Sequence, residues 1–166
     1  MRKAALALLA VALLATGCSH EAGTSGHASP SDRLPDVSLA SLTGGPAVDL
    51  GKLRGPAVVN LWAQWCTPCR RELPIYESFF QRHRTAVSVL GVDWQDTRPD
   101  DARSLARKSG VTYPLVADTE PKIRGRFLPK LVLVDADGRI AYEEYVEIKS
   151  LDQLEQLVEK HLGVTL

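Results

Sequence analysis

Two cysteines with two residues between them are the part of this 166-residue chain best suited to chemistry. Such a pair can bind zinc together with a second pair, attach a c-type haem when His follows it, or cycle between dithiol and disulfide. The pair is Cys66 and Cys69, and Arg70 follows it. The chain has only three cysteines, so no second pair exists and the spacing favours dithiol–disulfide chemistry. The alternative is a purely structural disulfide, which gains little chain entropy from so short a loop.

That chemistry needs the first cysteine at the start of a helix. The apolar run at 57–63 predicts a buried strand, and the pattern after it predicts a helix over 67–83. Unpaired N–H groups and the helix dipole at the helix start stabilise the Cys66 thiolate, which is the attacking species. Pro68 is tolerated in the first turn, since the N–H it lacks has no helical partner there.

The rest of the chain alternates strands and helices. Apolar runs, turn residues and helical spacing predict a mixed α/β domain made of βαβ units, followed by a β-hairpin and a final helix. The predicted elements are a hairpin at 37–42 and 47–50, strands at 87–92, 115–117, 131–134 and 139–146, helices at 99–109 and 151–162, and a helical turn at 120–126. No internal repeat is present, so we expect one folded domain over 34–166.

The N-terminus has the pattern of a secretion signal. Arg2 and Lys3 precede an apolar run of 12 residues at 4–15, which is too short to span a bilayer and matches a signal-peptide core. The run ends in small residues followed by Cys18, which resembles a bacterial lipobox. We therefore expect a signal peptide at 1–17 and lipidation of Cys18. The alternative is a secreted protein cut near Ala15 or Gly17.

The net charge of the chain limits the classes of partner that it can bind. Lys and Arg total 20, as do Asp and Glu, and loss of the signal peptide leaves a net charge of −2. A nucleic-acid binder needs a basic excess, so we expect no nucleic-acid partner. Residues 18–33 are rich in Ser, Gly, Ala and His and predict a flexible tether, with the lipid providing the contact with the membrane. We expect no metal, no cofactor and a monomer.

Residues 57–80, including the Trp-Cys-Thr-Pro-Cys segment, resemble the thioredoxin superfamily. More narrowly, the chain resembles the TlpA/ResA-type extracytoplasmic thiol–disulfide oxidoreductases over residues 34–162. The resemblance implies a thioredoxin-like fold, in which a central mixed β-sheet is flanked by helices. It also implies two additions to the thioredoxin core, namely an N-terminal β-hairpin and an αβ segment inserted between Val92 and Leu115.

The resemblance assigns roles to individual residues. Cys66 matches the exposed nucleophile, and Cys69 matches the buried resolving thiol. Glu72 matches a glutamate that this branch carries three residues after the second cysteine, on the same helix face. A partly buried carboxylate there takes the proton of Cys69 and, when ionised, raises the pKa of that thiol. The alternative is a surface Glu72 paired with Arg70 or Arg71.

The resemblance also implies a substrate-binding surface. Leu128-Pro129, just before a predicted strand, resembles the cis-proline loop of the superfamily. A cis bond there places the Leu128 backbone beside Cys66, where it pairs with a substrate chain. We expect Trp65, Thr67 and Pro68 to border the same surface.

These features predict a membrane-anchored disulfide reductase acting outside the cytoplasm. The Cys66 thiolate attacks a protein disulfide, and Cys69 resolves the mixed disulfide. Glu72 and Asn60, which stands where cytoplasmic thioredoxins carry a buried Asp, favour this direction. The resemblance implies a membrane thiol-relay protein as electron donor, and clients such as apocytochrome c or other cofactor-assembly proteins.

Three alternatives remain. The first is the same cycle run as a disulfide-donating oxidase, since reduction potentials of such proteins span about −120 to −270 mV. The second is a peroxidase on a related fold, which would carry Pro and Thr or Ser where Val59 and Ala63 stand. The third is a copper-binding module, which would have wider cysteine spacing and a distant His, whereas no His occurs between His83 and His161.

Overall fold

The structure is a computed structural model that describes residues 32–166. The predicted signal peptide at 1–17, Cys18 and most of the predicted tether at 18–33 lie outside the described residues. Within residues 32–166, no helix has both the length and the apolar character needed to cross a membrane.

Seven strands, three α-helices and a short 3-10 helix make up the ordered elements of this region. The strands are β1 (Ser38–Ser41), β2 (Val48–Asp49), β3 (Ala57–Trp62), β4 (Ser88–Trp94), β5 (Leu115–Asp118), β6 (Lys130–Val134) and β7 (Ile140–Glu144). The helices are η2 (Leu50–Lys52), α1 (Thr67–His83), α2 (Pro99–Lys108) and α3 (Leu151–Leu162).

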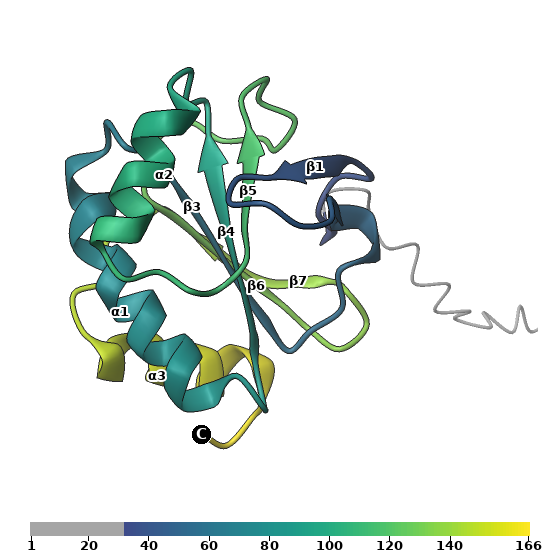
Figure 1. Cartoon of the computed structure of the whole chain (residues 1–166). Coiled ribbons are helices and arrows are strands. Elements are labelled where there is room, and N and C mark those ends of the chain that lie inside the picture. The colour runs from purple at the N-terminus through teal and green to yellow at the C-terminus, as the bar shows by residue number, and fades with distance from the viewer. Residues whose placement is uncertain (1–31) are drawn as a thin grey trace, which may run out of the picture.

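The strands form one mixed sheet in the order β2-β1-β5-β4-β3-β6-β7 (Figure 1). β3 lies inside the sheet, parallel to β4 and antiparallel to β6. All six of its residues are buried, as expected of a strand covered on both faces. The strand that leads to the two cysteines is therefore held from both sides.

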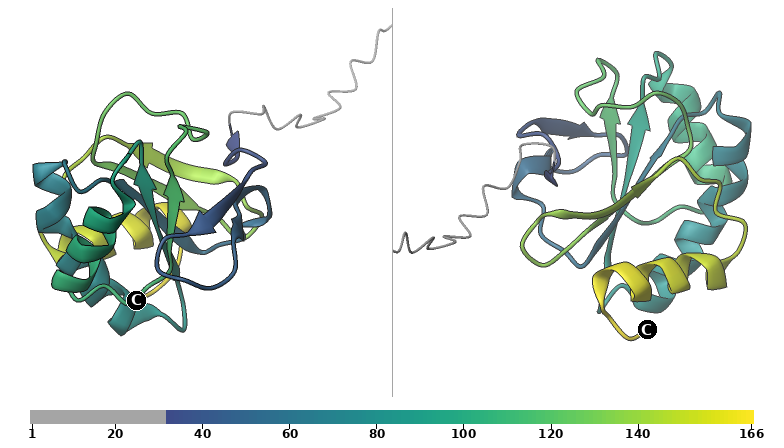
Figure 2. Two further views of the ribbon diagram at one scale, coloured as in Figure 1. Left: turned by 45° about the horizontal axis from the view of Figure 1, so that its top comes forward. Right: turned by 180° about the vertical axis from the view of Figure 1, so that it is seen from behind.

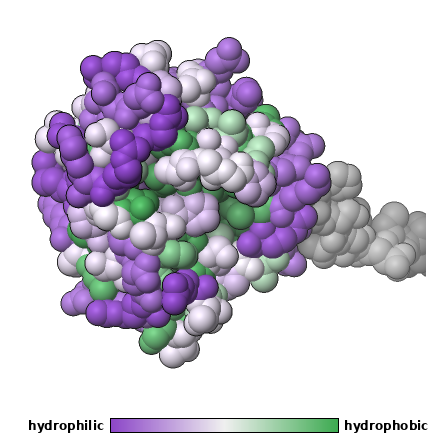
Figure 3. Space-filling view, viewed as in Figure 1, coloured by the Kyte–Doolittle hydropathy of each residue, from purple (hydrophilic) through white to green (hydrophobic). Residues whose placement is uncertain are grey.

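The two faces of the sheet are covered differently. All three α-helices lie on one face, and the β1–β2 hairpin with η2 covers part of the other (Figures 1 and 2). Successive β3 side chains point to opposite faces. Trp62 therefore joins the cluster under the helices with Tyr76 and Phe79, while Leu61 joins the cluster under the hairpin with Leu39. Polar side chains cover the edges of the face seen in Figure 3, with apolar areas nearer its centre.

Polar contacts cap the N-terminus of α3 and join the helix to α1. Its N-cap Ser150 accepts a hydrogen bond from the Gln153 N–H through Oγ at 3.2 Å. Its C-cap Gly163 has a left-handed backbone with φ of 65°, which glycine adopts without penalty. Glu155 of α3 accepts from Arg82 and contacts His83 of α1, at 3.1 and 2.7 Å. These contacts join the two helices beside their apolar interface.

One predicted element is wrong. Residues 120–126 form bends and coil, where a helical turn was expected. The Asp118 carboxylate accepts hydrogen bonds from the Lys122 and Ile123 N–H groups, with shortest distances of 3.0 and 2.9 Å. Trp94 also donates through Nε1 to the Ile123 carbonyl at 2.9 Å. Side chains of β4 and β5 thus bond to backbone groups of this segment, and such bonds compete with helical pairing.

Candidate active site

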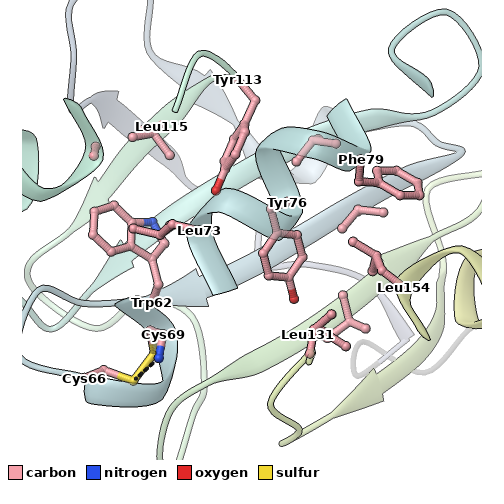
Figure 4. Packing of buried hydrophobic residues seen from close by; sticks show 14 of the residues in the cluster. Trp62, Cys66, Cys69, Leu73, Tyr76, Phe79, Tyr113, Leu115, Leu131 and Leu154 are labelled. Carbon is pink, nitrogen blue, oxygen red and sulfur yellow. Dashed lines mark hydrogen bonds between the residues drawn. A yellow bond between two sulfur atoms is a disulfide. The ribbon is translucent and has the colours of Figure 1, made fainter. Parts of the chain in front are cut away.

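Cys66 and Cys69 form a disulfide at the N-terminus of α1, with their Cα atoms 5.3 Å apart. Cys66 is the N-cap residue, and its Sγ accepts a hydrogen bond from the Cys69 N–H at 3.3 Å (Figure 4). The sulfur thus lies where the free N–H groups and the dipole of a 17-residue helix favour negative charge. After reduction, this position stabilises a thiolate on Cys66.

The two sulfur-bearing residues differ little in access in this oxidised state. Cys66 is 5% exposed and Cys69 is 0% exposed. The burial of Cys69 matches the expected resolving thiol, but Cys66 is buried as well, so the exposed nucleophile that the resemblance implied is not found in this oxidised form. Trp65 and Thr67 are exposed beside it, and Pro68 is half-buried. A partner protein would meet these three side chains before it met the sulfur.

Glu72 belongs to α1, the helix that carries the disulfide, and it is buried. Its side chain is one turn after Cys69, and its residue is 1% exposed. Its Oε1 accepts a short hydrogen bond from the Ile148 N–H. Burial raises the pKa of Glu72 to about 8 and Glu147 adds to the rise, while the Ile148 N–H and Arg71 act in the opposite direction.

The surface alternative for Glu72 is therefore wrong. Arg71 instead pairs with Glu147, with its Nη2 2.6 Å from Oε1, and Glu72 is left without a cation partner among the described residues. A carboxyl with a pKa near 8 can gain or lose a proton at ordinary pH. Glu72 thus has the chemistry to exchange a proton with a neighbouring thiol.

The predicted proline loop has the expected backbone. The Leu128–Pro129 peptide bond is cis, Pro129 is buried and Leu128 is half-buried. The next residue, Lys130, is also buried, and its Nζ lies 3.0 Å from Glu143 Oε1 and donates to the Arg124 carbonyl at 2.8 Å. The loop is thus anchored to β7 and to the preceding segment. Its contact with a substrate stays a prediction.

The structure adds two buried acids that the sequence interpretation missed. The strand predicted over 87–92 continues to Trp94 as β4, which places Asp93 inside the sheet. Asp93 and Asp96 are both buried. Asp96 accepts the Gln64 N–H at 3.0 Å, two residues before Cys66. The available signal was an acid ending an apolar run beside the strand that leads to the cysteines.

Comparison with known proteins supports this chemistry. The family model for the AhpC/TSA family matches residues 30–143. A thiol-disulfide oxidoreductase ResA from Bacillus thuringiensis (strain Al Hakam) is 28% identical over 123 residues, covering 70% of this chain and 69% of that protein.

Two solved structures are similar to this chain in fold. A secreted thiol-disulfide isomerase from Corynebacterium glutamicum is 26% identical, with a TM-score of 0.62 over 79% of this chain and 89% of that one. A thioredoxin family thiol:disulfide interchange protein from Chlorobium tepidum TLS is similar in fold, with a TM-score of 0.64 over 80% of this chain and 97% of that one, at 20% identity. The fold is thus thioredoxin-like, as the resemblance implied.

Proposed function

The chain belongs to the AhpC/TSA family and is a ResA/TlpA-like thiol–disulfide oxidoreductase, and from that premise we propose that it reduces disulfides of proteins outside the cytoplasm. In this proposal Cys66 is the nucleophile, Cys69 is the resolving thiol and Glu72 is the proton acceptor. The disulfide seen in the structure is the form in which the cycle ends.

The cycle transfers two electrons from the enzyme to its substrate. The Cys66 thiolate attacks one sulfur of the substrate disulfide, which forms a mixed disulfide and releases the other sulfur as a thiolate. Cys69 then loses its proton to Glu72 and attacks the Cys66 sulfur. The Cys66–Cys69 disulfide forms and the second substrate sulfur leaves as a thiolate, so both substrate sulfurs end reduced and take up protons from Glu72 and solvent.

The buried carboxyl of Glu72 is the observation that carries the direction. A carboxylate one helical turn from Cys69 disfavours a thiolate there and raises the pKa of that thiol. Destabilising the thiolate makes the reduced protein a stronger electron donor, whereas strong oxidants stabilise their reduced form. Burial keeps Glu72 away from the solvent that would weaken this effect.

The setting outside the cytoplasm rests on the N-terminal sequence and on a solved relative that is described as secreted. We propose that a lipid on Cys18 anchors the mature chain to the outer face of the cytoplasmic membrane. A membrane thiol-relay protein would return electrons to the oxidised pair. A monomer is sufficient for this cycle, since both cysteines come from one chain.

The substrate would dock beside the disulfide. Trp65 and Thr67 are exposed there, Pro68 lies in the first turn of α1, and the cis Leu128–Pro129 bond precedes β6. The Leu128 backbone is proposed to pair with an extended segment of the client, which places its disulfide against Cys66. The proposed clients are apocytochrome c or other proteins of cofactor assembly.

The reduction potential of the pair tests the direction. The measurement uses the chain with Cys18→Ser, so that Cys66 and Cys69 are its only thiols, equilibrated in thiol–disulfide buffers and followed by Trp fluorescence. We expect a value near or below about −250 mV. A value near about −120 mV would instead assign the oxidase direction, and the absence of any reversible transition would refute the dithiol cycle.

The mass of the mature protein tests the anchor. We expect cleavage before Cys18 with the added mass of acyl chains, and loss of membrane association in the Cys18→Ser variant. Cleavage elsewhere without added mass would show a secreted protein instead. This result would leave the assignment of the dithiol cycle unchanged.

A further inference from the structure

Asp93 and Trp62 lie side by side on the helix-covered face of the sheet. They are register partners in the parallel pair of β3 and β4, so their side chains point to the same face. That face is the one under the helices, because Trp62 belongs to the cluster there (Figure 4). Val92 and Trp94, the neighbours of Asp93, belong to the cluster on the opposite face.

The polar atoms of these two side chains lack the partners that they need as ordinary acceptors and donors. Both carboxylate oxygens of Asp93 are buried and receive no N–H or O–H hydrogen bond from the described residues, and the buried Nε1 of Trp62 has no acceptor among them. Buried polar atoms are paired in nearly all native structures, so an ionised Asp93 would be strongly disfavoured here. A proton on Asp93 removes most of that cost.

A second carboxylate faces Asp93. The charge of Asp96 and its hydrogen-bonding side chain both act on Asp93, and together with burial, which acts most strongly, they raise the pKa of Asp93 to about 8. Two adjacent carboxyl groups do not both ionise readily, so one proton between them is the stable arrangement. Asp93 accepts no N–H hydrogen bond from the described residues, so Asp93 is the carboxyl that holds this proton.

Other charged groups on the surrounding elements are engaged elsewhere. Arg98 pairs with Asp101, and Arg103 pairs with Asp100 in the first turn of α2. Carboxylates on packed elements are also engaged: Asp118 of β5 by the Lys122 and Ile123 N–H groups, Glu72 of α1 by the Ile148 N–H, and Glu77 of α1 by the Thr112 N–H. Among the described residues, Asp96 is the one charged group that shifts the pKa of Asp93.

Asp96 is also bonded to the loop that carries the nucleophile. One of its oxygens accepts the Gln64 N–H at 3.0 Å, and the other accepts the Arg98 N–H at 2.9 Å. Gln64 precedes Cys66 by two residues. The Asp96 carboxylate therefore helps to fix the position of the segment between β3 and α1.

We propose that Asp93 is a positioning residue that holds one proton shared with Asp96 and thereby fixes the Cys66-bearing loop. The Asp93 hydroxyl donates to Asp96, which keeps its other lone pairs for Gln64 and Arg98. When pH rises, the proton passes to solvent and two carboxylates face each other. Their repulsion draws Asp96 away from the Gln64 N–H and loosens the loop. The proposal rests on the dithiol cycle at Cys66 but not on its direction.

The test is an NMR titration of the oxidised Cys18→Ser chain, with carbon-13 in its aspartate carboxyls. We expect one carboxyl resonance to titrate near pH 8, where the pKa of Asp93 lies, and to disappear in Asp93→Asn. The Gln64 amide resonance should shift with the same midpoint and stay constant in Asp93→Asn. Asp101→Asn, an exposed acid of α2, is the matched control and should change neither signal.

A second readout connects the proton to reactivity. Glu72 titrates in the same range, so the reduced chain is compared as Glu72→Gln and as Glu72→Gln with Asp93→Asn. We measure the rate at which Cys66 of each reduced chain reacts with a small disulfide as pH rises through 8. The two chains should agree below this range, and the chain that keeps Asp93 should fall several-fold behind above it.

An Asp93 carboxyl that titrates at the ordinary value for aspartate overturns the proposal, and this result needs no variant. So does a Gln64 amide that ignores the titration, or equal rates in the two chains throughout. None of these outcomes bears on the reduction potential, so failure here is separate from failure of the proposed reductase.

Discussion

At the scale of single residues, Glu72 gives the most direct prediction. Above its pKa of about 8, Glu72 places a buried negative charge one turn from Cys69, so Glu72→Gln should lower the pKa of the Cys69 thiol by about one unit or more. The measurement is the pH dependence of alkylation of the reduced Cys18→Ser chain, with each cysteine followed by mass spectrometry. Glu147→Gln, which removes a more exposed charge nearby, should have a smaller effect. Unchanged thiol titrations in Glu72→Gln would remove Glu72 from the cycle.

The reactive pair was predictable from sequence, but the environment of its acids was not. The spacing of Cys66 and Cys69 and the helix after them identify the chemistry, because both features are local. Glu72 is buried by contact with Ile148, which lies 76 residues further along the chain. Asp93 was missed for a related reason, since only the pairing of β4 with β3 shows that it continues the strand.

At the scale of elements, the capping of α3 can be tested by substitution. Ser150→Ala removes the oxygen that accepts the Gln153 N–H, and loss of such a cap costs about 1 kcal/mol of folding free energy. Urea unfolding measures this change. Ser78→Ala, an exposed site inside α1, is the matched control and should change stability by less than about 0.5 kcal/mol. Equal effects at both sites would show that the cap contributes nothing specific.

Elements with local signals matched their predictions. The helix predicted over 67–83 is α1 with the same bounds, and the helix at 151–162 is α3. Both begin at a residue whose side chain accepts an N–H of the first turn, Cys66 and Ser150. In the segment at 120–126, by contrast, the side chains of Asp118 and Trp94, which lie outside the segment, bond to its backbone. Local patterns cannot register such a competitor.

At the scale of the whole molecule, two buried acids set a pH dependence of stability. The pKa values of Glu72 and Asp93 rise from 4.5 and 3.8 to about 8 on folding. The folded state therefore binds more protons across this window, so the free energy of unfolding falls as pH rises through it. Each group contributes a slope of at most about 1.4 kcal/mol per pH unit, and the loss is complete above the folded pKa.

Urea unfolding at a series of pH values across this window measures the slope. Glu72→Gln and Asp93→Asn should each reduce it, and the double variant should be nearly flat, because amides do not titrate. Asp101→Asn, an exposed control on α2, should leave the slope unchanged. A wild-type stability that rises from the acid end of the window to its alkaline end would contradict the raised pKa values of both groups.

The redox state of the pair also acts on the whole molecule, and its sign separates reductase from oxidase. Folding and disulfide formation form one thermodynamic cycle. A folded pair that is more reducing than the same pair in the unfolded chain must therefore make the oxidised protein the more stable form. The difference is about 1.4 kcal/mol for every 30 mV between the two potentials.

With Glu72 buried beside Cys69, we expect the oxidised Cys18→Ser chain to unfold at higher urea than the reduced chain. The cysteine-free Cys18→Ser, Cys66→Ser, Cys69→Ser chain should show no dependence on added reductant. A reduced form that is more stable than the oxidised form would mean that the fold stabilises the dithiol, and the protein would then donate its disulfide to substrates.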